Sequence, residues 1–129
     1  MAIQVFPVSD ATSLRINVSG DLFISGWDQP KVRVVADDDD GMVAQQNQDD
    51  LQIIAPDDLV LTVPAAITLL IGHAGGDVEL KDLTGSITLS QAGGDVTAQR
   101  LNTLSLGNVG GDVELRQING RLSVGQIGG

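Results

Sequence analysis

The sequence predicts an all-β fold, a single-stranded parallel β-solenoid (a β-helix) of coils about 18 residues long. The first observation behind this prediction is a repeat: Gly-Gly-Asp-Val occurs at 75–78, 93–96 and 110–113, and Gly128-Gly129 begins a fourth copy. The first glycines of successive copies are 18, 17 and 18 residues apart. A short sequence that recurs at a fixed period is typical of a fold in which equivalent units stack.

The second observation is that apolar residues within each copy recur at every second position, which is the periodicity of a strand with one buried face. A helix would need spacings of three and four, and so many glycines would destabilise it. Each copy is expected to form two short strands that turn at Gly-Gly-Asp and near Thr84-Gly85, and equivalent strands should pair in parallel about 4.8 Å apart. The six apolar columns are Ala74/Ala92/Val109/Ile127, Val78/Val96/Val113, Leu80/Ala98/Leu115, Leu83/Leu101/Ile118, Ile87/Leu104/Leu122 and Leu89/Leu106/Val124.

The chain is expected to be one domain over residues 1–129, with regular coils at 67–129 and an irregular N-terminal β cap at 1–66. Within the cap, the segment 18–22 (Val-Ser-Gly-Asp-Leu) is similar to the repeat corner. Alternating β-branched residues between Gly, Pro and Asp clusters predict six strands there. These are Ser13–Val18, Leu22–Ser25, Lys31–Ala36, Met42–Gln46, Leu51–Ala55 and Leu59–Val63.

Composition excludes several classes of function. The chain has 17 acidic and 7 basic residues and a net charge of −10, which argues against binding to the phosphate backbone of nucleic acid. It has no cysteine, so no disulfide supports the fold. Residues 1–5 lack the basic and apolar regions of a signal peptide. No apolar stretch reaches the roughly 18 residues of a membrane-spanning helix, so we expect no direct membrane insertion.

Short motifs accompany the repeat: Ser19-Gly20-Asp21, Gly26-Trp27-Asp28, Val63-Pro64 before the first regular coil, and the Gly-Asp-Val corners. From about Ser13 to Gly129 the chain thereby resembles the bacterial Toast-rack family of adhesin-like β-strand-repeat proteins. The resemblance implies an envelope-associated or exported protein of adhesin-like architecture. It supplies no catalytic residues, since none are defined for that family. Location at the cell envelope or outside the cell is an expectation from the resemblance alone.

The corner residues Asp77, Asp95 and Asp112 are expected to lie one above another along the stack. Their oxygens are the ligand type that Ca²⁺ prefers, so a calcium- or other ligand-binding module is the alternative function. The calcium-binding repeat G-G-x-G-x-D is not matched, because Val78 and Leu80 stand at its third glycine and its aspartate positions. Aspartate after two glycines also suits a turn, where it hydrogen-bonds its own backbone. We therefore predict turn residues, with no metal ion and no cofactor.

The acidic run Asp37–Gly41 is similar to part of an EF-hand loop. It would place Ala36 at the first loop position and Asn47 at the twelfth, where a bidentate Glu is needed. The mismatch at both positions predicts a solvated loop in place of a calcium site.

No enzymatic site is expected. His73 is the only histidine, and it aligns with Gln91, Asn108 and Gln126 in a polar turn column. No G-x-S-x-G motif is present. Three narrow coils with three aromatic residues in the whole chain do not form the long groove in which polysaccharide-cleaving β-helices place paired acids.

The leading hypothesis is a non-enzymatic structural or adhesin-like scaffold that forms homo-oligomers. One candidate surface is the end of the stack, where the last coil should leave three apolar residues uncovered. The other is the flat face of the second strands, whose outward residues are small and uncharged. The residues of these two surfaces are Leu122, Val124 and Ile127 for the end, and Thr88, Ser105 and Ser123 for the face.

Overall fold

The computed structural model describes residues 2–8, 12–36, 43–47 and 50–128. Within these residues twelve strands form one sheet and no segment is helical, which confirms the all-β prediction. The strands are β1 Ala2–Pro7, β2 Ser13–Val18, β3 Leu22–Trp27, β4 Lys31–Ala36, β5 Val43–Gln46, β6 Asp50–Ala55, β7 Leu59–Pro64, β8 Thr68–Ala74, β9 Val78–Ala92, β10 Val96–Val109, β11 Val113–Ile118 and β12 Leu122–Ile127. The six strands predicted in the N-terminal half are present to within two residues at either end.

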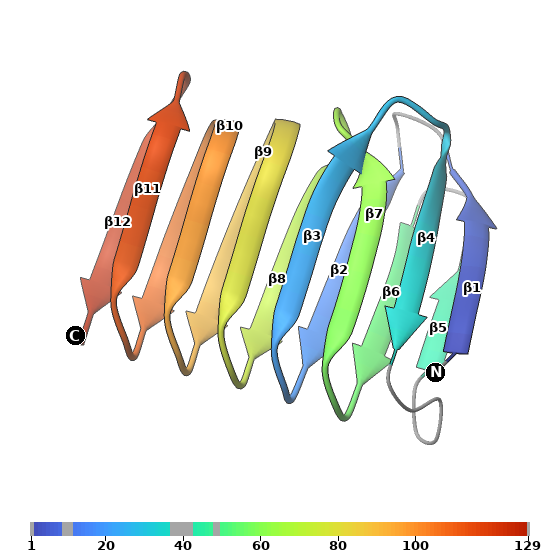
Figure 1. Ribbon diagram of the computed structural model, residues 1–129, viewed down its shortest axis with the longest axis horizontal. Helices are drawn as coiled ribbons and strands as arrows, with labels where there is room; N and C mark the ends of the chain where they lie inside the picture. Colours follow the sequence, from blue (N-terminus) through green and yellow to red (C-terminus); the bar gives the residue numbers. More distant parts are fainter. Residues whose placement is uncertain (1, 9–11, 37–42, 48–49, 129) are drawn as a thin grey trace.

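The strands lie in two rows that face each other (Figure 1). The front row runs β1-β4-β7-β3-β9-β10-β11. The rear row runs β5-β6-β2-β8-β9-β10-β12. Strands β9 and β10 bend halfway and contribute to both rows. We call one front strand, the following rear strand and their connection a coil.

The predicted repeat sets the register of the C-terminal coils. Val96 pairs with both Val78 and Val113, and Leu104 pairs with both Ile87 and Leu122, all in parallel. At the N-terminal end, however, β1–β4, β4–β7 and β5–β6 are antiparallel. The sheet is therefore mixed, and a wholly parallel arrangement is not what forms. The reason is that the chain reverses within one row at this end: the link from β5 to β6 joins two neighbouring strands of the rear row, and the link from β3 to β4 joins two strands of the front row. Each link between β8 and β12 instead crosses from one row to the other.

Order along the chain and order in space differ at this end. Strand β2 pairs with β6 on one side and β8 on the other, and β3 lies likewise between β7 and β9. Residues 13–27, from the predicted cap, thus lie between β6–β7 and the first regular coil. The link from β7 to β8 passes beside the end of β3, where the N–H of Ala65 donates to the carbonyl oxygen of Trp27.

The core is aliphatic and fills the space between the two rows. Inward residues such as Leu14, Leu61, Leu80 and Leu89 are fully buried, and strand residues alternate with outward neighbours. Thr12 is the one polar residue buried within the described part of the chain. In the last described coil the inward residues become half-buried or exposed, because the described residues place no coil on their outer side.

The predicted turn near Thr84-Gly85 is a bend inside a continuous strand. Asp82, Arg100 and Gln117 stand at the equivalent bend of successive coils with φ of 57°, 56° and 56°, the left-handed region that few non-glycine residues adopt. The Arg100 guanidinium hydrogen-bonds the Asp82 carboxylate of the preceding coil and lowers the pKa of Asp82. A bend, unlike a loop, keeps the two halves of β9 hydrogen-bonded to β10 on either side of it.

Candidate functional site

The corner aspartates form a hydrogen-bonded column along the stack. The backbone N–H of Asp77 donates to Oδ1 of Asp21 at 2.8 Å, that of Asp95 to Asp77 at 2.9 Å, and that of Asp112 to Asp95 at 2.8 Å. The N–H of Asp21 donates in the same way to Asp58 at 2.8 Å. The carboxylates of Asp58, Asp21, Asp77 and Asp95 thus each accept a hydrogen bond from the next coil, whereas the sequence suggested a bond to the backbone of the same residue. The segment at 18–22 is part of this column.

This column also explains why glycine precedes each aspartate. A Cβ on Gly94 would lie 2.3 Å from Oδ1 of Asp77, and one on Gly111 would lie 2.1 Å from Oδ1 of Asp95. The carboxylate of one coil therefore occupies the space that a side chain of the next would need. The Gly-Asp pairs therefore connect neighbouring coils: the glycine leaves room for the carboxylate of the preceding coil, and the aspartate N–H donates to it.

The column of corner aspartates is poorly suited to bind a metal ion. The carboxylates of Asp77 and Asp95 already accept hydrogen bonds from the protein. Among the described residues no three His, Cys, Asp or Glu side chains are grouped so that they could hold a metal ion. The acidic run at 37–41 lies outside the described residues.

Replacing Asp95 by Ala is expected to lower the free energy of unfolding by about 1 kcal/mol, because it leaves the Asp112 N–H without its charged acceptor. Asp112→Ala is the matched control, since within the described chain no group donates to that carboxylate. Its effect should be less than half as large. Asp95→Asn retains an acceptor and should recover most of the loss. Urea unfolding measures all three, and equal effects of Asp95→Ala and Asp112→Ala would contradict the coupling.

The end of the stack exposes apolar side chains. Leu122, Val124 and Ile127 are 44%, 39% and 42% exposed. Their partners one coil earlier, Leu104 and Val109 among them, are at most 3% exposed. The outer edges of β11 and β12 have no strand beside them in the described structure (Figure 1).

The outward faces of the two rows differ as the sequence predicts. On the rear row Thr88, Ser105 and Ser123 lie in one register. On the front row the outward residues are longer and form ion pairs within a strand, such as Lys81 with Glu79 at 2.9 Å. The rear face is thus small and uncharged along β9, β10 and β12.

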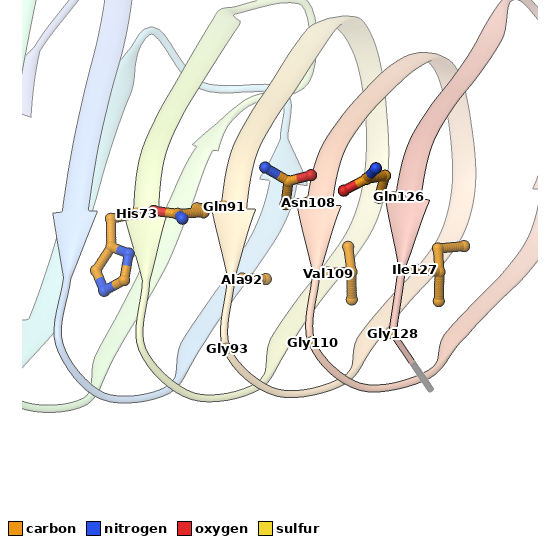
Figure 2. A pocket seen from close by; sticks show the side chains of 10 residues that line it. All are labelled: His73, Gln91, Ala92, Gly93, Asn108, Val109, Gly110, Gln126, Ile127 and Gly128. Atoms are coloured by element: carbon orange, nitrogen blue, oxygen red, sulfur yellow. The ribbon is translucent and has the colours of Figure 1, made fainter.

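A depression of about 610 Å³ runs across the ends of the rear strands beside the glycine corners (Figure 2). His73, Gln91, Asn108 and Gln126 stand along it, one from each strand. No hydrogen bond joins these four side chains to one another or to the rest of the described chain. Among the residues that line the depression, none is a carboxylate and His73 is the one titratable side chain.

The structure adds an apolar row that the sequence analysis missed. Ile3, Val35, Val60 and Phe23 pair in one register across the outside of β1, β4, β7 and β3. Ile3 and Val60 are 49% and 44% exposed. The sequence does contain apolar residues at these outward strand positions. They can be recognised as one continuous row only when the order of the strands in the sheet is known.

No protein-family model matches the chain, and no curated protein matches it. Among solved structures the chain is similar to the crystal structure of a "putative cell adhesion protein" from Clostridium sporogenes. The TM-score is 0.42 and the identity 12%, over 98% of this chain and 97% of that chain. Similarity at this level assigns no function. The described residues include no helix with the length and apolar character needed to cross a membrane.

Proposed function

We propose that the chain is a non-enzymatic β-solenoid scaffold, adhesin-like in architecture, that associates with itself through the end of its stack. The observation that carries the proposal is the exposure of Leu122, Val124 and Ile127 in columns that are otherwise buried. The parallel pairing of β8 to β12 at the repeat period supports the solenoid. The adhesin-like role comes from the sequence resemblance.

The energetics predict reversible association. Burying a fully exposed aliphatic side chain contributes about 1.5–3 kcal/mol. These three are already more than half buried, so covering them contributes roughly 2–4 kcal/mol per copy and about twice that for two copies. This is of the same order as the estimated 4–15 kcal/mol that association costs in lost freedom of motion, so the dimer is expected to be weak and reversible. The free edges of β11 and β12 add backbone hydrogen bonds when two ends meet. Two copies joined end to end by a two-fold axis would pair these edges in antiparallel fashion.

The double variant Leu122→Lys/Val124→Lys is expected to be monomeric in light scattering at tens of micromolar, where the unmodified chain forms dimers. Two buried ammonium groups would repel each other and lose hydration. Ser123→Lys lies between the two positions but on the outer face, so it is the matched control and should still dimerise. A strictly monomeric unmodified chain would overturn the proposal. If the unmodified chain and the double variant both dimerise while Ser123→Lys does not, the contact lies on the flat rear face instead of the end of the stack.

A further inference from the structure

The spacing of inward residues changes between β2 and β8. In β2 every second residue points inward through Val18, whereas β8 has one more residue between Ile71 and Ala74. The pairing of β2 with β8 therefore shifts between Ile16 and Asn17, which is a β-bulge. Bulges re-aim side chains at the place where they occur.

The outer surface of the rear row is hollowed at this bulge. The depression measures about 300 Å³, and we call it the bulge pocket. A Cβ on Gly72 would lie 2.7 Å from Oδ1 of Asn17, so the missing side chain leaves room for the Asn17 amide. The side chains that line the bulge pocket are Arg15, Asn17, Gln52, Leu70, Thr88 and Ser90.

Arg15 is the one charged residue in the bulge pocket, and no carboxylate of the described residues lines it. Arg15 is exposed on β2 and takes no part in the ion pairs of the described chain, which join other residues. This environment is unusual in a chain with 17 acidic and 7 basic residues. A guanidinium that is free of protein carboxylates is available to bind a carboxylate of a ligand in two parallel hydrogen bonds.

The opposite side of the bulge pocket carries hydroxyl groups. Thr88 and Ser90 lie on β9, which is separated from β2 by β8 alone. Two strand spacings are roughly 10 Å, which is wide enough for a single sugar ring. Leu70 stands between the two sides, in register with Arg15 and Thr88. Hydroxyl side chains both donate and accept, so they match the hydroxyl groups of such a ligand.

We propose that the bulge pocket binds a small polyhydroxylated carboxylate, a uronic acid. The carboxylate of the ligand lies on Arg15, its hydroxyl groups meet Thr88 and Ser90, and the apolar face of its ring lies over Leu70. Asn17 and Gln52 supply further amide donors at the carboxylate end. Because the pocket is open and has no aromatic ring, binding is weak, in the millimolar range. The proposal does not depend on self-association, since the bulge pocket and the end of the stack share no residue.

The test is a titration of the full chain with D-glucuronate, followed by amide chemical shifts, with D-glucose as the ligand control. Saturable shifts around β2, β8 and β9 are expected with glucuronate, and none with glucose at the same concentrations. Arg15→Gln should weaken glucuronate binding about tenfold. Arg33→Gln is the matched control, because Arg33 is exposed on the front row and its loss changes the net charge equally.

Each outcome decides the proposal. Unchanged affinity in Arg33→Gln and a tenfold loss in Arg15→Gln support it. Equal loss in both variants shows general electrostatic attraction and overturns it, as do equal shifts with glucose or shifts that do not saturate. Both substitutions are on exposed side chains, and an unchanged melting temperature shows that folding is not the cause.

Discussion

Replacing Gly75 by Ala is expected to lower the free energy of unfolding by roughly 2–3 kcal/mol. A Cβ there would lie 2.2 Å from the carbonyl oxygen of Ser19 and 2.9 Å from its carbonyl carbon. Both atoms belong to the backbone of the neighbouring coil, so no side-chain rotation relieves the overlap. The two coils must move apart at a corner where Gly75 N–H also donates to Val18.

Gly128→Ala is the control for this prediction, because Gly128 holds the same repeat position in the last coil. Its nearest contact for a Cβ is 3.0 Å from the Gly110 oxygen, with nothing stacked beyond it. We expect a loss within about 0.5 kcal/mol. Urea unfolding of both variants gives the comparison through the midpoint at constant slope. Equal losses would show that the corner tolerates a side chain and that glycine serves another purpose.

Leu80→Ala is expected to cost roughly 2–5 kcal/mol, the range for removing a fully buried leucine. Leu80 is completely buried, with Ile24 on one side and Ala98 on the other in its column. The small Ala98 cannot fill the cavity that this substitution leaves.

Leu115→Ala is the matched change in the same column of the last coil. Leu115 is half-buried and has a coil on one side only, so we expect a loss of about 1 kcal/mol or less. Calorimetric unfolding of the two variants tests the gradient. A loss at Leu115 as large as that at Leu80 would mean that another chain covers the end in solution, which would itself agree with self-association.

Strand positions were predictable because the residues that set them are neighbours in sequence. Alternation of β-branched and polar residues located β2, β4 and β7. Strand β1 was missed, since Ile3 and Val5 point outward and its pairing with β4 is long-range. The position of β2 and β3 in the middle of the stack could not be predicted from the sequence either, because it depends on contacts between residues far apart in the chain.

The chemistry of the candidate sites was less predictable than the fold. Asp77, Asp95 and Asp112 were correctly placed at corners. That a corner carboxylate accepts a hydrogen bond from the next coil could not be predicted, because this depends on the distance between coils. The bulge pocket draws Arg15 and Thr88 from segments 73 positions apart, as their residue numbers show. A signal was nevertheless present in the extra residue of β8 relative to β2, which predicts a change of register wherever the two strands meet.

The position of residues 13–27 inside the stack has a consequence for cooperativity. In a repeat array whose coils follow chain order, the end units can fray one at a time, and stability is close to a sum over neighbours. Here the first coil in sequence is an internal one in space, held on both sides by strands that come later. Strands β1 and β5 are edge strands with one partner each, so they can fray, as β11 and β12 can. Strands β2 and β3 cannot leave the sheet without opening the middle of the molecule, so the two ends of this chain should unfold by different routes.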